Sequence, residues 1–175
     1  EVIAPWIRAQ HHVIPGAAVA TGADALCSPP MTDPRIIEEF SIPYILRLRE
    51  LCPVPVAVVN WWGDSLVEPL ESFLDLKRRV CRGVMRAQDP DLARVGPEAF
   101  KRYADAHGLA LELGVGDVLL NQGPPAAIRE RIRRYIEGAA RGGRLILYLA
   151  SLNAETPPGH VRVALDAARE LGVYR

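Results

Sequence analysis

The feature that most constrains this chain is the alternation of short apolar runs with segments of helical periodicity. Runs such as PVAVV (55–59) and RLILYLAS (144–151) carry few polar residues, which is typical of strands buried on both faces. The segments between them have apolar residues spaced for one helix face, with Pro near the start and Gly near the end. Strand and helix repeated in this way predict βαβ units and a parallel sheet.

The boundaries follow from the same pattern. Strands are expected at 23–28, 54–60, 109–116 and 144–151, with a weaker strand inside 81–95. Helices are expected at 33–51, over part of 65–80, where Pro69 is expected to lie in the first turn or to break the helix, and at 97–108, 124–143 and 156–172. Asp33 and Thr156 are expected to cap the first and last of these helices, and Pro43 to kink the first. No change of composition marks a linker, so a single domain over 1–175 is predicted.

The length of the chain limits the fold. A closed eight-stranded α/β barrel takes about 250 residues, and this chain has 175. GVG at 114–116 lacks the third glycine of a dinucleotide-binding fingerprint. We favour the C-terminal half of a (β/α)8 TIM-type barrel, and a small open parallel α/β sheet is the alternative.

Charge and cysteine content exclude several classes of function. Lys+Arg and Asp+Glu both number 21, so no positive field favours a nucleic acid partner. The basic cluster at 129–141 is interpreted as the solvated face of a helix. No membrane span or signal peptide is expected, and the chain is expected to be part of a longer or processed product. Three cysteines without CxxC spacing favour a reducing, cytoplasmic setting.

Polar and aromatic residues follow the expected strands, where parallel α/β barrels carry their sites. The candidate substrate-binding residues are Ser28, Asn60, Trp61, Trp62, Asn121, Gln122, Ser151, Asn153 and His160. They suit a flat small molecule that is hydrogen-bonded and stacked. Asp64 and Glu155 are the candidate general bases, although Asp64 also suits a helix N-cap and Glu155 a helix N-terminus. Because side chains alternate in an extended segment, only one of the two tryptophans is expected to face the site.

Five segments carry a resemblance to a known family: GADAL (22–26), EEFSIPYILRLREL (38–51), PVAVVNWWGD (55–64), GPPAAIRERIRRYIEGAARGGRLIL (123–147) and ETPPGHVRVALDAARELG (155–172). In their order and spacing the chain resembles the uroporphyrinogen decarboxylase superfamily, and within it the corrinoid-dependent methyltransferases of the methylcobalamin:coenzyme M type. The resemblance implies a longer (β/α)8 barrel, methyl transfer, and a corrinoid protein as partner.

The zinc site of that branch is not retained. Its zinc ligands are a His-x-Cys pair before Gly-Asp and a Cys in the last strand, and together they turn a thiol into a thiolate. The corresponding residues here are Asn60, Trp62 and about Ala150, which do not supply such a site. We therefore expect no zinc and no other tightly bound cofactor.

Two alternatives remain open. One is a tetrapyrrole (uroporphyrinogen) decarboxylase, which needs several arginines for the substrate carboxylates, and no such cluster follows the expected strands. The other is a non-catalytic barrel half whose uncovered sheet edges pair with a second copy in a homo-oligomer or with a separate N-terminal half.

Overall fold

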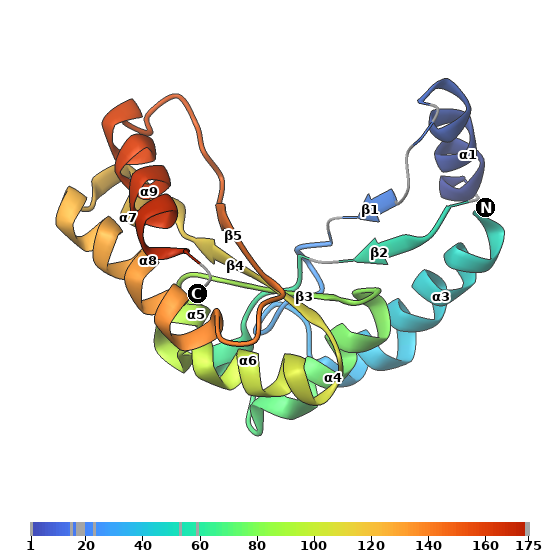
Figure 1. Cartoon of the computed structure of the whole chain (residues 1–175). Helices are drawn as coiled ribbons and strands as arrows, with labels where there is room; N and C mark the ends of the chain where they lie inside the picture. The colour runs from blue at the N-terminus through green and yellow to red at the C-terminus, as the bar shows by residue number, and fades with distance from the viewer. Residues whose placement is uncertain are drawn as a thin grey trace. The chain divides into compact units, whose positions relative to one another are not determined.

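The computed structural model of the chain describes residues 2–14, 16, 20–22, 24–52, 54–58 and 60–173. The chain divides into two compact units, Glu1–Met85 and Arg86–Arg175, and each is described here by itself (Figure 1). Both contain helices and a small sheet with parallel strand pairing, which confirms the mixed α/β class. The single domain and the half barrel stay predictions.

The first unit is built around a two-stranded sheet. Its elements are α1 (Ile3–Val13), β1 (Ala20–Gly22), α2 (Pro34–Ile36), η1 (Ile37–Ser41), α3 (Ile42–Leu51), β2 (Val56–Val58), η2 (Asp64–Leu66) and α4 (Leu70–Val80). β1 and β2 pair in parallel, with Thr21 opposite Ala57. The main core of the unit contains Ile37, Ile42, Val58, Trp61 and Phe73.

One expected strand in this unit is wrong. The strand expected at 23–28 lies earlier, because β1 ends at Gly22 and residues 24–28 form turns closed by backbone hydrogen bonds such as Cys27 N–H to Asp24 O. Ala23 lies outside the described residues. The helix expected over part of 65–80 is confirmed as α4, which begins at Leu70, so Pro69 interrupts this segment as one of the two expectations had it. The strand expected at 54–60 is confirmed over Val56–Val58, and Val59 lies outside the described residues.

The helix expected at 33–51 contains a π-helical segment. Asp33 caps it as expected, with its carboxylate accepting from the Arg35 N–H at 2.8 Å. The segment Ile37–Ser41 then widens into a π-helix immediately before Pro43. A proline lacks an N–H and crowds the carbonyl four residues earlier, and a wider turn relieves both problems. The expected disruption at Pro43 therefore takes the form of a π-helix.

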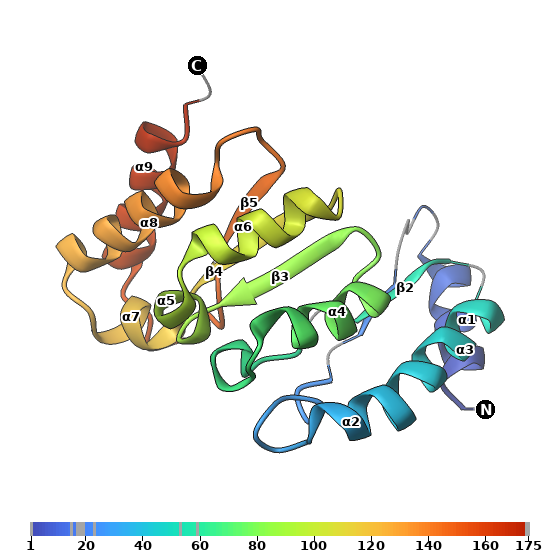
Figure 2. The same ribbon diagram turned by 90° about the horizontal axis from the view of Figure 1, so that it is seen from below.

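The second unit contains β3 (Val84–Gln88, which begins just before the unit boundary), α5 (Asp91–Val95), α6 (Pro97–Ala106), β4 (Ala110–Val115), α7 (Asp117–Gln122), α8 (Pro125–Ala139), β5 (Leu145–Leu149) and α9 (Pro158–Leu171). The strand order is β3-β4-β5, and β4 pairs in parallel with β5. α8 and α9 lie side by side (Figure 2). Among the described residues, no helix is both long and apolar enough to cross a membrane.

Most expected elements of the second unit are confirmed, including the weak strand, which is β3. The short helices α5 and α7 were not predicted. The apolar residues of α7 continue the pattern of β4, so the turn at Gly116 is not visible in the sequence. The capping role expected of Thr156 is wrong, because α9 begins at Pro158 after Pro157. The Thr156 hydroxyl bonds to Asn121 instead.

Candidate functional site

The two tryptophans that follow β2 have different surroundings. Trp61 is only 1% exposed and packs in the core of the first unit. Trp62 is half-buried, and its backbone N–H donates to the Ser28 hydroxyl at 2.9 Å. This difference is the one expected from side-chain alternation. It leaves Trp62, next to Ser28, as the more accessible of the two rings.

Gly63 is required by the path of the chain at this point. Its φ is +90°, and a Cβ built on it would lie 2.2 Å from the Pro29 carbonyl oxygen. Any side chain would both strain the backbone and collide with a fixed carbonyl. The backbone therefore requires a glycine at position 63, whether or not a zinc ion binds nearby.

Asp64 lies in a buried ion pair with Lys77. The Lys77 ammonium donates to the two carboxylate oxygens at 2.8 and 3.0 Å, and the side chains are 0% and 4% exposed. The capping role expected of Asp64 is wrong, since η2 starts at Asp64 itself and α4 only at Leu70. A role as general base stays a prediction, and it would require this pair to open.

Four of the candidate residues meet in the second unit, around the loop between β5 and α9. The Thr156 hydroxyl donates to Asn121 Oδ1 at 2.5 Å and accepts from the Asn153 N–H at 3.2 Å. The Glu155 N–H donates to Asn153 Oδ1 at 2.8 Å. His160 Nδ1 lies 2.8 Å from the Leu120 carbonyl, so this nitrogen carries the proton. The loop is thereby tied to α7.

The remaining candidates of the second unit, Ser151 and Gln122, lie in this loop and in α7, whereas Asn60 follows β2 in the first unit. Ser151 is exposed, and its φ of +52° is unusual for a residue with a side chain. The Glu155 side chain is also exposed. Gln122 lies at the end of α7 and lines a cavity of about 480 Å³. That volume is within the range of small-molecule sites.

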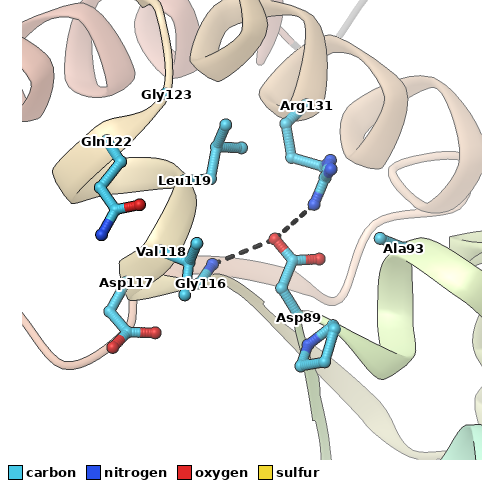
Figure 3. A pocket seen from close by; sticks show the side chains of 10 residues that line it. Asp89, Ala93, Gly116, Asp117, Val118, Leu119, Gln122, Gly123 and Arg131 are labelled. Atoms are coloured by element: carbon cyan, nitrogen blue, oxygen red, sulfur yellow. Dashed lines mark hydrogen bonds and ion pairs between the residues drawn. The ribbon is translucent and has the colours of Figure 1, made fainter.

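The cavity lies between α5, α7 and α8, where β3 and β4 end (Figure 3). Pro90 and Ala93 line it from the side of α5, Val118 and Leu119 from α7, and Arg131 from α8. Its walls are therefore mainly apolar, with a guanidinium at one side. Of the residues predicted from the sequence, only Gln122 lines this cavity.

Asp89 organises the polar side of the cavity. Its Oδ2 accepts from the Gly116 N–H at 3.0 Å and pairs with the Arg131 guanidinium at 2.6 Å, and its Oδ1 accepts from the Tyr135 hydroxyl. Burial, then the Asp89 charge, raises the pKa of Tyr135, so this hydroxyl stays protonated and donates. Burial alone would lower the pKa of Arg131, but Asp89 and Tyr135 more than offset it. The carboxylate thus joins the end of β4 to α8.

Sequence reasoning missed both members of this pair. Asp89 directly follows β3, and the other candidates were selected because they follow expected strands. Asp89 was not selected because the sequence indicates β3 only weakly. Arg131 was assigned to a solvated helix face. That assignment is wrong for Arg131, which faces Asp89, while Arg133 on the same helix pairs with the exposed Glu130 and Glu137.

One face of the β3-β4-β5 sheet carries a polar cluster. Arg86 pairs with Glu112 at 2.7 Å, and its guanidinium lies 4.9 Å from the centre of the Tyr148 ring. The Tyr148 hydroxyl donates to Gln88 Oε1 at 2.8 Å. Burial raises the pKa of Tyr148, which keeps this hydroxyl a donor. The alternate residues of the strands, such as Met85 and Leu113, are buried.

Gly114 allows Tyr148 to lie across β4, since a Cβ there would be 2.5 Å from the Tyr148 Cζ and 2.8 Å from the Gln88 Cβ. We expect Gly114→Ala to lower the free energy of unfolding by about 1–3 kcal/mol, because the ring and strand must shift. Urea unfolding followed by circular dichroism measures this. Gly159→Ala is the control, since nothing lies within 4 Å of its Cβ position. The cost should shrink in a Tyr148→Val background, and an unchanged cost there would contradict the steric explanation.

No group of three or more His, Cys, Asp or Glu side chains suited to a metal ion occurs in the part of the chain that the structure describes. The residues at the positions of the zinc ligands offer an amide, an indole and a methyl group, a donor set that does not fit zinc. The absence of bound zinc stays a prediction.

No protein-family model and no curated protein sequence matches the chain. Its structure is similar to that of a methyltransferase from Methanosarcina mazei, with a TM-score of 0.67 and 18% sequence identity. The chain therefore shares the fold of the matched part of that structure. The similarity covers 97% of this chain and 46% of the methyltransferase, so the chain spans about half the length of that structure.

Proposed function

We propose that this chain is the C-terminal half of a (β/α)8 barrel of the uroporphyrinogen decarboxylase superfamily, and that the complete barrel transfers a methyl group between a corrinoid protein and a small acceptor. The observation that carries the proposal is the similarity of nearly the whole chain to about half of a methyltransferase. The parallel pairs β1–β2 and β4–β5 and the family-like segments support it. The other half is supplied by a preceding segment or by a second chain.

The acceptor is activated without zinc in this proposal. The methyl group leaves cobalt without the bonding electron pair, a lone pair of the acceptor forms the new bond, and the proton of the acceptor passes to a base. Of the two candidate bases, Asp64 is held in its buried ion pair with Lys77. Glu155 is exposed in the loop between β5 and α9, which is hydrogen-bonded to α7. We therefore assign the base role to Glu155, with Asn121, Asn153 and His160 shaping the loop that presents it.

The test is a methyl-transfer assay on the full protein that contains this chain, with methylcobalamin as donor and coenzyme M as acceptor, followed by the visible absorption of the corrinoid. We expect turnover, and a loss of about 100-fold in rate for Glu155→Gln, since general bases contribute this much or more. Asp166→Asn, an exposed carboxylate on α9, is the matched control.

Three results would contradict the proposal. Decarboxylation of uroporphyrinogen without methyl transfer would replace it with the decarboxylase alternative. Stoichiometric zinc in the purified protein would overturn zinc-free activation. The half-barrel assignment would be overturned if the isolated chain sediments as a stable monomer and neither binds a second half nor self-associates.

A further inference from the structure

The cavity between α5, α7 and α8 has the features of a ligand site that methyl transfer does not require. Its volume of about 480 Å³ accommodates a small organic molecule. Its walls are built from Pro90, Ala93, Val118 and Leu119, with Arg131 and Asp89 on one side (Figure 3). A mainly apolar cavity with a few fixed polar groups, here the Asp89–Arg131 pair, is the usual composition of such sites.

Arg131 has donors to offer to a ligand. A guanidinium carries five N–H groups in a fixed fork. In the described part of the chain its acceptors are Asp89 at 2.6 Å and the Tyr135 hydroxyl at 3.5 Å, and both are reached through a single terminal nitrogen. Among the described residues, the Nε–H and the other terminal NH2 have no acceptor, and the side chain is 26% exposed. Asp89 holds the fork in place, so its orientation is set before a ligand arrives.

The charge of the site selects the class of ligand. Asp89 is only 9% exposed and already balances the charge of Arg131. A second carboxylate on Arg131 would face the Asp89 charge as well, and like charges at close range disfavour each other. The exposed Asp117 at the rim adds further negative charge. A neutral oxygen acceptor gains the hydrogen bond without this repulsion.

We infer that this cavity binds a neutral, mainly apolar molecule through a carbonyl or amide oxygen that accepts from Arg131. Its apolar body lies against Pro90, Ala93, Val118 and Leu119. The inference goes beyond methyl transfer and does not depend on it.

The experiment uses three probes of similar shape: benzamide, benzoate and toluene. Binding is followed by NMR shifts of the Val118 and Leu119 methyl groups and of the Arg131 Nε–H. Benzamide is expected to shift all three signals and to bind about tenfold more tightly than toluene or benzoate. A tenfold difference corresponds to about 1.4 kcal/mol, which one hydrogen bond to a charged donor can supply.

Two variants decide the role of Arg131 and of the cavity. Arg131→Met should weaken benzamide about tenfold and leave toluene unchanged, whereas Arg133→Met, which removes an exposed arginine from the same helix, should change neither. If Arg131→Met unfolds the protein, the Val118→Trp variant decides instead. Val118 is exposed, so this variant should fold. Val118 also lines the cavity, so the indole ring should fill it and abolish benzamide binding.

Tighter binding of benzoate than of benzamide would overturn the neutral-ligand assignment. Benzamide shifts that avoid Val118 and Leu119, or that persist unchanged in Val118→Trp, would overturn the site itself. These readouts record binding alone, so they separate failure of this inference from failure of methyl transfer.

Discussion

Asp89→Ala is expected to lower the free energy of unfolding by about 3 kcal/mol. The substitution leaves Arg131 without its anion and removes the acceptor of the Gly116 N–H and the Tyr135 hydroxyl. Breaking one side of a buried ion pair costs about 3–5 kcal/mol, and the lower end applies because the Arg131 side chain is 26% exposed and gains some hydration. Urea unfolding followed by circular dichroism measures the loss.

Asp89→Asn refines this prediction. The amide keeps an acceptor oxygen and the shape of the side chain but removes the charge, so a loss of about 1–2 kcal/mol is expected. Asp117→Ala, an exposed carboxylate on the wall of the same cavity, is the control and should leave stability unchanged. If Asp89→Ala were as stable as this control, the carboxylate would not join β4 to α8 in solution.

Lys77→Met is expected to cost about 3–5 kcal/mol in the first unit. Methionine keeps a long apolar side chain near Phe73, whose ring centre lies 5.7 Å from the Lys77 ammonium. It removes the cation that faces Asp64, and a carboxylate with 0% exposure has no water to replace that cation. The measurement is the same urea titration, with Arg78→Met, an exposed arginine of α4, as control.

A double variant separates the ion pair from the packing of Lys77. Adding Asp64→Asn to Lys77→Met removes the carboxylate charge that Lys77 balances in the unmodified chain, so the double variant should be more stable than Lys77→Met alone. A double variant that is no more stable than Lys77→Met would show that the lost contacts of the Lys77 side chain, and not the charge of Asp64, account for the effect.

Several elements were predictable from the sequence because their determinants are local. The apolar runs at Val56–Val58, Ala110–Val115 and Leu145–Leu149 form strands, as expected of runs that carry few polar residues and are bounded by polar, Gly or Pro residues. Asp33 caps its helix because an aspartate before Pro34 has the matching backbone amide within reach. Failures occurred at 23–28, where residues 24–28 form turns instead of a strand and Leu26 is exposed, and at Asp117–Gln122, where the short helix α7 was not predicted.

The candidate site was predictable only in part. Proximity to strand ends selected Asn121, Asn153, Glu155 and His160, and the structure gathers these around one loop. The same rule missed Asp89, because β3 is weakly marked in the sequence. It also missed Arg131, because the sequence does not indicate which residue a charged side chain on a helix will contact. The Asp89–Arg131 pair forms only when α8 packs against the end of β3.

The sequence by itself determined the alternation of strand and helix and the absence of a His-x-Cys pair before Gly63 and Asp64. Both are properties of residue type and spacing, which do not depend on contacts between distant segments. Only the tertiary structure decided that Trp61 is buried, that Asp64 is paired with Lys77, and that Asp89 joins three donors beside a cavity. The pairings of Asp64 and Asp89 join residues far apart in the chain, and their energies come from burial that exists only after the helices have packed.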